Sequence, residues 1–310
     1  MRMIITVTMN PAIDKTITIP AFVHGGLNRI QTMESDIGGK GINVSRTIKV
    51  LGGLSKAIGF AGGNGGERIR TSLKQIGIQT DFIPVNGETR CNTKIVEADG
   101  VVTELNEPGA EVTPMQIEAL LRIVNAYVAE GALFVLSGSV PKGVPVDIYA
   151  RITENVHMKG GKVLLDADGE LFRKALDAKP DIIKPNRMEL ESLYGVQDAS
   201  LEELRSMGEK FIEQGISKVA ISLGSEGAIF LEKEKALYGK GLQVKANSTV
   251  GAGDAIVATL AYAWERKMTM EQYAPLAIAA SAGAVTTVGT KPPTREVVNS
   301  LLEKVEMVTL

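Results

Sequence analysis

The sequence predicts an α/β fold, in which helices flank a doubly wound, mainly parallel β-sheet and a small β-sheet forms a lid. Short apolar segments that are followed by glycine and then by a helical pattern recur along the chain, as in parallel βα units. Several of these segments are almost continuously apolar, which is typical of strands buried on both faces. Two further stretches have strand patterns with no helix between them, and they predict the separate lid sheet.

The expected elements follow one another in a single domain over residues 1–310. The strands of the main sheet are expected at residues 3–8, 56–61, 133–137, 162–166, 181–184 and 219–223. The helical patterns lie at residues 41–51, 67–76, 114–129, 146–158, 187–194, 201–214, 253–267, 270–288 and 294–305.

The lid is expected to consist of two pairs of strands. Residues 16–22 and 28–35 form the first pair, and residues 89–98 and 101–106 form the second. Asp99-Gly100 between the last two strands is a strong hairpin-turn signal. The lid strands are therefore inserted at about residues 16–35 and 89–107, and a sheet inserted in this way can cover an active site.

Composition excludes several classes of protein. The chain has 34 Lys and Arg against 36 Asp and Glu, with 44% apolar residues, so it is not a disordered chain and has no basic excess for nucleic acid or for a membrane surface. The weakly polar residues 277–289 fall short of the ~20 apolar residues of a membrane-spanning helix. Cys91 is the single cysteine and there are only two histidines, so neither an intrachain disulfide nor a His/Cys zinc cluster is expected. We expect a cytoplasmic protein from a reducing compartment.

The sharpest motif is Asn-Ser-Thr-Val-Gly-Ala-Gly-Asp at residues 247–254, which directly precedes an apolar helix. Gly251 and Gly253 allow backbone N–H groups to approach a ligand closely, and the helix adds the positive end of its dipole. Asp254 would repel a phosphate there, so it makes chemical sense as a base that orients and deprotonates an attacking hydroxyl. The alternative is that Asp254 is a first-turn residue stabilised by the helix dipole.

A second glycine-rich segment, Gly-Gly-Lys-Gly-Ile-Asn at residues 38–43, opens another helix. It lacks the Walker A spacing, and the chain has no complete Gly-x-Gly-x-x-Gly, so neither a P-loop nor a Rossmann dinucleotide site is expected. Lys40 and Asn43 are three residues apart and can share one helix face toward a polyol. A tight turn with a helix cap is the structural alternative for the glycine pair.

Three more motifs follow predicted strands, and ligands of open parallel sheets bind beyond the carboxyl ends of strands. In Lys-Pro-Asn-Arg-Met-Glu-Leu at residues 184–190, Asn186 and Glu189 can form a helix cap, hold Mg²⁺ through water molecules, or do both. The segments Ser-Leu-Gly-Ser-Glu-Gly at residues 222–227 and Ser-Gly-Ser-Val-Pro-Lys-Gly at residues 137–143 place glycines or hydroxyls at strand ends. A simple turn is the alternative for each.

Taken together, these motifs resemble those of the ribokinase-like (PfkB) carbohydrate kinase family. The resemblance covers nearly the whole chain and also includes Thr-Met-Asn-Pro-Ala-Ile-Asp at residues 8–14 and Gly-Glu-Thr-Arg ending at Arg90. The Asn-Pro-x-x-Asp start, Arg90 and the Lys-Pro-Asn segment are most similar to the branch that acts on phosphorylated sugars. Three places depart from the residues common in the family: Cys91-Asn92, the Asp-Ala-Asp-Gly segment at residues 166–169, and Ala255. These departures affect the identity of the expected sugar more than the expected reaction.

The resemblance implies a set of roles. Asp254 resembles the catalytic base, and Gly251, Ala252 and Gly253 resemble the anion hole for the transferred phosphoryl group. The residues that resemble the sugar-phosphate site are Asp14, Arg29, Gly38, Gly39, Lys40, Asn43, Arg90 and Ser139. Those that resemble the ATP site are Lys184, Asn186, Ser222, Gly224, Gly227 and Thr249, with Glu189 and Asn186 holding Mg²⁺ through water.

The implied reaction is transfer of the γ-phosphoryl group of MgATP to a ketohexose phosphate, by a homodimer joined through the lid. Fructose 1-phosphate, which would give fructose 1,6-bisphosphate, is the first choice of substrate, followed by tagatose 6-phosphate and then fructose 6-phosphate. The alternatives from other classes are a non-catalytic sensor of nucleotide and sugar phosphate, and a nucleoside or vitamin kinase.

Overall fold

The computed structural model describes residues 2–129, 131–247 and 250–310. Within these residues, a large sheet of ten strands runs in the order β14-β13-β12-β11-β10-β9-β8-β1-β4-β5. Its strands are β1 (Met3–Thr8), β4 (Ser55–Ala61), β5 (Gln79–Pro84), β8 (Ala132–Ser137), β9 (Lys162–Asp166), β10 (Ile182–Ile183), β11 (Lys218–Ser222), β12 (Gly227–Glu232), β13 (Lys235–Lys240) and β14 (Met307–Thr309). Neighbours from β5 through β11 pair in parallel, and β12, β13 and β14 are antiparallel additions at one edge.

The sheet is doubly wound, as predicted. The chain lays β4 and β5 on one side of β1 and then crosses to place β8 on the other side. This reversal creates a topological switch point, where ligands of open α/β sheets bind beyond the carboxyl ends of the strands.

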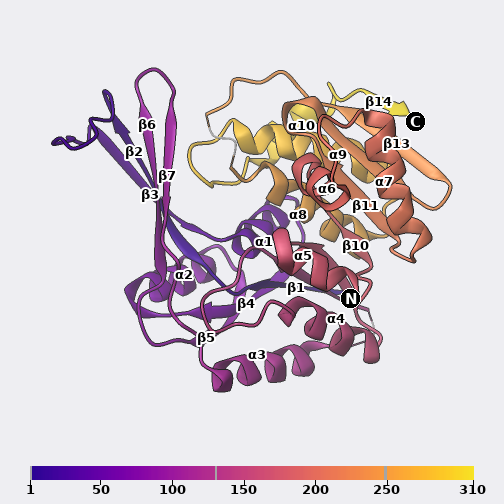
Figure 1. Cartoon of the computed structure of the whole chain (residues 1–310), viewed down its shortest axis with the longest axis horizontal. Coiled ribbons are helices and arrows are strands. Elements are labelled where there is room, and N and C mark those ends of the chain that lie inside the picture. The colour runs from indigo at the N-terminus through magenta and orange to yellow at the C-terminus, as the bar shows by residue number, and fades with distance from the viewer. Residues whose placement is uncertain (1, 130, 248–249) are drawn as a thin grey trace.

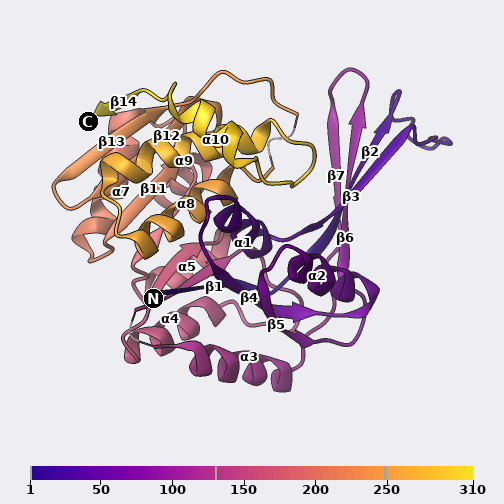
Figure 2. The same cartoon turned by 180° about the vertical axis from the view of Figure 1, so that it is seen from behind.

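Helices cover both faces of the large sheet (Figures 1 and 2). One face packs against side chains of α3 (Pro114–Tyr127), α4 (Ile148–Met158), α5 (Gly169–Leu176), α6 (Arg187–Tyr194) and α7 (Leu201–Glu213). The other face packs against α1 (Lys40–Val50), α8 (Ala252–Arg266) and α9 (Met270–Val285). The remaining helices are α2 (Gly63–Gln75), α10 (Arg295–Leu302) and the 3₁₀ turn η1 (Gly224–Glu226).

The lid is a separate four-stranded sheet with the order β3-β2-β6-β7, and its far end projects from the body of the protein in Figure 1. Its base packs against α1 and α2. Its strands are β2 (Ala12–Ile19), β3 (Thr32–Gly38), β6 (Arg90–Glu97) and β7 (Val102–Asn106). The first insertion is longer than the predicted 16–35, because the antiparallel pairing of β2 with β3 continues from Thr18 and Thr32 down to Ala12 and Gly38.

Several elements differ from the sequence prediction. The strand expected over residues 181–184 is reduced to Ile182–Ile183, and α9 ends at Val285 rather than at residue 288. Helix α5 and strands β5, β12, β13 and β14 were not predicted. The hairpin of β12 and β13 turns through Glu-Lys-Glu-Lys without the usual glycine or asparagine, and Glu234 adopts the positive φ of 61° that such a turn needs.

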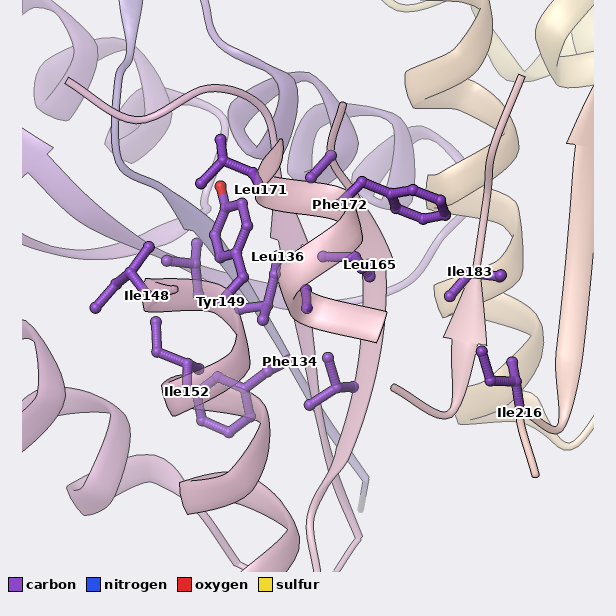
Figure 3. Close-up of a cluster of buried hydrophobic side chains, with 14 of the residues drawn as sticks. Phe134, Leu136, Ile148, Tyr149, Ile152, Leu165, Leu171, Phe172, Ile183 and Ile216 are labelled. Atoms are coloured by element: carbon purple, nitrogen blue, oxygen red, sulfur yellow. The ribbon is translucent and has the colours of Figure 1, made fainter. Parts of the chain in front are cut away.

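The core below the binding edge is dense (Figure 3). Phe134 and Leu136 of β8 pack with Ile152 and Tyr149 of α4, and all four side chains are fully buried. The Tyr149 hydroxyl donates a hydrogen bond of 2.9 Å to the carbonyl of Gly138, in the loop that follows β8. The core therefore supports one of the loops at the switch point directly. In the described part of the chain, no helix combines the length and the apolar character needed to cross a bilayer.

Phe134→Ala should lower the free energy of unfolding by about 3–5 kcal/mol, because it removes a large side chain that is fully buried and leaves a cavity. Urea unfolding followed by circular dichroism measures this change. Met158→Ala is the control, since Met158 is 76% exposed on α4 and its truncation should change little. Equal stability of the two variants would contradict the packing described here.

Candidate active site

A cavity of about 790 Å³ lies at the carboxyl ends of the central strands and is lined by both the lid and the main domain. Most of the predicted site residues line it. These are Asp14, Gly39, Lys40, Asn43, Arg90, Lys184, Asn186, Glu189, Ser222, Gly224, Gly227, Gly251, Ala252, Gly253 and Asp254. Residues of the lid strands β2 and β6, of the segments that follow β10 and β11, and of the starts of α1, α6 and α8 thus meet in one place.

The start of α8 forms the centre of the cavity. Gly251 precedes the helix with a φ of 90°, in the left-handed region that favours glycine. The first turn of the helix then presents its backbone N–H groups, which are suited to binding an anion. A side chain at position 253 would extend toward the ammonium group of Lys184, since its Cβ would lie 3.6 Å from Nζ.

Asp254 is buried in this first turn, with only 7% of its surface exposed. Its Oδ2 accepts a hydrogen bond of 2.8 Å from Nδ2 of Asn43 in α1. Burial raises the pKa of Asp254 to about 6, and the negative charge of Asp166 adds to this rise, while the hydrogen bond from Asn43 opposes it. A carboxylate with such a pKa is suited to accepting a proton near neutral pH.

Asp166 is a residue that the sequence analysis missed. It ends β9 and is 1% exposed, and its two oxygens face Lys184 at 3.1 Å and Lys40 at 3.6 Å. Burial alone would raise the pKa of Asp166, but the two ammonium groups outweigh it and lower that pKa. The pKa of Lys40 is raised in turn, chiefly by Asp166. Asp166 is at the carboxyl end of a buried strand, where ligands of open parallel sheets bind, but a single acid there has no spacing pattern that marks it.

Gly38, shortly before α1, makes room for the Asp14 carboxylate of the lid. A Cβ at Gly38 would overlap the Asp14 carboxylate, so Gly38 is required for close packing and does not itself line the cavity. Asp14 accepts a hydrogen bond of 3.0 Å from Nδ2 of Asn92. Burial raises the pKa of Asp14, and the Asn92 hydrogen bond opposes this rise.

Asn186 and Glu189 form the helix-capping box that the sequence allowed. The Asn186 side chain accepts from the backbone N–H of Glu189, and the Glu189 carboxylate accepts from the backbone N–H of Asn186, both at 2.8 Å. Burial raises the pKa of Glu189. Among the described residues, no group of three or more His, Cys, Asp and Glu side chains could hold a metal directly. The oxygen atoms of Asn186 and Glu189 suit an ion such as Mg²⁺, which keeps several of its water ligands.

Besides Gly38, two predicted site residues do not line the cavity. Arg29 is exposed on the loop between β2 and β3, and Ser139 is exposed after β8, where its hydroxyl accepts a weak hydrogen bond of 3.4 Å from Asn10. Neither lines the cavity, because the lid loop points outward and the turn after Gly138 faces solvent. Thr249 falls outside the described residues.

Arg90 does line the cavity, as predicted. Its Nε donates to the carbonyl of Asn10 at 3.3 Å and its Nη1 donates to the carbonyl of Glu107 at 3.2 Å. These backbone contacts fix the guanidinium at the base of the lid.

The profile of the pfkB family of carbohydrate kinases matches residues 7–296. The chain belongs to this family. It is 36% identical to a 1-phosphofructokinase of Bacillus subtilis over 99% of this chain and 100% of that one, and 37% identical to a 1-phosphofructokinase of Borreliella burgdorferi over 90% of each. Membership of the family makes the chain a phosphotransferase that takes ATP as its phosphoryl donor.

Solved structures confirm the predicted ribokinase-like fold. Phosphofructokinase-2 from Escherichia coli, in a structure with potassium, matches with a TM-score of 0.91 and 28% identity over 98% of this chain and 99% of that chain. A ribokinase from Thermotoga maritima, which is 22% identical, matches in fold with a TM-score of 0.78 over 98% of this chain and 100% of that one.

Lys184→Met should destabilise the protein by about 3–5 kcal/mol, because it leaves Asp166 buried with Lys40 as its remaining ammonium partner. Urea unfolding at pH 7 measures the loss. Adding Asp166→Leu to the same chain should recover part of it, since the uncompensated charge is then removed. Lys162→Met is the control, because it breaks an ion pair with Asp181 in which Lys162 is 52% exposed. A loss no larger than that of the control would contradict the buried pair.

Proposed function

We propose that the protein is a 1-phosphofructokinase, which transfers the γ-phosphoryl group of ATP to the 6-hydroxyl of fructose 1-phosphate. The observation that carries this proposal is the buried Asp254 carboxylate beside the N-terminus of α8, in a cavity shared with the lid. The two curated relatives above have this activity in their names and match nearly the whole chain.

Asp254 is proposed as the base. Its carboxylate accepts the proton of the 6-hydroxyl as that oxygen attacks the γ-phosphorus, and the N–H groups of residues 251–253 stabilise the phosphoryl group in transit. Asn43 holds the carboxylate in place through its 2.8 Å hydrogen bond. The lid, which forms part of the cavity wall, is proposed to limit access of water, which would otherwise compete for the phosphoryl group.

Lys40 and Lys184 are proposed to neutralise charge at the reaction centre. Both contact Asp166, and Lys40 is close enough to Asp254 for the two charges to interact. These contacts favour a role for Lys40 at the reaction centre rather than in binding the phosphate of the sugar. Asp14, Gly39 and Asn43 remain the proposed partners of the sugar hydroxyls, and Arg90 of the substrate phosphate.

The nucleotide is proposed to lie along Ser222, Gly224 and Gly227, which line the other end of the cavity. Asn186 and Glu189 would hold Mg²⁺ through water, next to the phosphates. When bound, this ion supplies charge neutralisation to the β- and γ-phosphate oxygens.

The lid is proposed to join two subunits. Strand alternation places Met33 and Leu105 on the face opposite Asp14 and Asn92, and both are more than half exposed, at 60% and 56%. Apolar side chains exposed together on one sheet face are typical of an interface. Arg29 does not reach the cavity of its own chain, so its proposed contact with the substrate phosphate requires a second subunit. One solved form of the Escherichia coli relative is a tetramer.

Asp254→Asn should lower kcat at least ~100-fold while leaving ATP binding intact, because the amide cannot accept the proton of the hydroxyl. A coupled assay measures turnover, and calorimetry measures nucleotide binding. A sensor protein would have no turnover to lose, and near-normal turnover of the variant would remove Asp254 as the base.

The pH profile gives a second check, since kcat/KM of the wild type should fall as the pH drops below about 6 and Asp254 becomes protonated.

A panel of ketose phosphates decides the sugar, with fructose 1-phosphate expected to give the highest kcat/KM. Activity confined to tagatose 6-phosphate or fructose 6-phosphate would rule out fructose 1-phosphate as the substrate.

Arg90→Ala should raise KM for the sugar phosphate at least ~10-fold with little change in KM for ATP, because a charge-assisted phosphate contact is lost. An unchanged KM would favour an unphosphorylated substrate, as in a nucleoside kinase.

The double variant Met33→Glu and Leu105→Glu should be a monomer under conditions in which the wild type is a dimer, because two charges would be buried at the lid interface. Light scattering coupled to gel filtration measures the mass. Met158→Glu, on the exposed face of α4, is the matched control. A wild type that stays monomeric at all concentrations would rule out the lid contact.

A further inference from the structure

The inner face of the lid carries a charged pair that the proposed mechanism does not use. Side chains alternate across a strand, so Asn92 and Lys94 of β6 point to the same face as Asp14 of β2. Glu104 of β7 is directly opposite Lys94 in the antiparallel register. All four side chains line the central cavity.

The two members of this pair differ in exposure. Lys94 Nζ lies 3.2 Å from Glu104 Oε1, and the Lys94 side chain is 13% exposed whereas that of Glu104 is 44% exposed. The ammonium is thus part of the cavity wall, and the carboxylate is at its open side. Lys94 also acts on Asp14: burial raises the pKa of Asp14, and the Lys94 charge is among the groups that oppose this rise.

A purely structural role explains this placement poorly. A cross-strand ion pair contributes only ~0.2–1 kcal/mol to a sheet, and Lys94, at 13% exposed, is more buried than the lysines of the Lys218–Glu232 and Lys240–Glu306 pairs, which are 25% and 55% exposed. Removing an ammonium from water is unfavourable unless something in the cavity compensates. The cavity of a kinase has such a partner in the phosphoryl groups of its substrates.

Of the other cations that line the cavity in the described part of the chain, Arg187 pairs with the half-exposed Glu226, and three are more firmly held. Lys184 and Lys40 contact the buried carboxylate of Asp166, and Arg90 donates to two backbone carbonyls. Lys94 is paired with a carboxylate that can turn out into solvent. A phosphate dianion carries more charge than a carboxylate and can replace it at the ammonium.

We propose that Lys94 binds a phosphoryl group of a ligand in the central cavity, and that Glu104 is the counter-ion which this group displaces. The inference rests on the proposed kinase function, which brings two phosphorylated ligands into the cavity, the sugar phosphate and ATP. Glu104 then weakens the binding of every anionic ligand. Its carboxylate pairs with the Lys94 ammonium and repels the phosphate until the Glu104 side chain turns away. An unphosphorylated sugar cannot displace it, so the pair selects for phosphorylated ligands.

Lys94→Met tests the binding role while preserving the length of the side chain. KM for one phosphorylated ligand should rise at least ~10-fold, with kcat changed less than about threefold, because the lost contact is made in the ground state and in the transition state alike. A rise in KM for fructose 1-phosphate identifies the sugar phosphate as the ligand of Lys94. A rise in KM for MgATP identifies the nucleotide instead.

Glu104→Gln tests the counter-ion, and the opposite direction is expected. KM for the same ligand should fall severalfold, because Lys94 is no longer occupied and the repulsion is gone. If the ion pair were purely structural, the two variants would not change KM in opposite directions, because loss of either partner would weaken the lid in the same way. Lys162→Met, which breaks the ion pair with Asp181 at the start of β9, should leave both KM values unchanged.

The proposal is overturned if Lys94→Met leaves both KM values unchanged, or if Lys94→Met and Glu104→Gln raise the same KM together. A wild type that phosphorylates no ketose phosphate would instead remove the proposed function. Calorimetric titration of the same proteins with fructose 1-phosphate and with MgATP then still decides the role of Lys94: weaker binding after Lys94→Met and tighter binding after Glu104→Gln support it, and any other pattern overturns it.

Discussion

The buried carboxylate of Asp166 holds the two halves of the active site together. It contacts Lys40, at the start of α1, and Lys184, in the loop that leads to α6, so that the parts of the cavity proposed to bind the sugar and the nucleotide share one ionic centre. A carboxylate this deeply buried stays charged only because two ammonium groups compensate it. The positions of the cations around the reaction centre therefore depend on this one residue.

The same centre sets the chemistry of Asp254. The negative charge of Asp166 adds to the effect of burial in raising the pKa of Asp254, whereas Lys40, Lys184 and the amide of Asn43 oppose that rise. The two acids thus have opposite environments, since Asp166 faces two cations and Asp254 faces a neutral amide. Environments that separate the pKa values of neighbouring acids are typical of sites where one stays charged and the other exchanges a proton.

Much of this arrangement could be predicted from the sequence. Apolar strands followed by glycine gave the parallel sheet, and the motifs at strand ends came together because the carboxyl ends of parallel strands meet at one edge. Asp166 was missed because a single acid after a buried strand has no spacing signal, and its importance depends on Lys40 and Lys184 arriving from distant segments. Lys94 and Glu104 were missed for a similar reason, since their pairing depends on the register of β6 with β7. Arg29 was assigned to the substrate phosphate, although a lone chain keeps it exposed and out of the cavity.

The lid has one apolar face and one polar face, and this has a consequence for how its strands are aligned. Moving β6 by a single residue against β2 would turn Asn92 and Lys94 outward and bring Ile95 into the cavity. An association that buries the apolar face would therefore penalise every misaligned pairing. Association would then favour the correct strand register of the lid. In that register the polar side chains of the lid face the cavity.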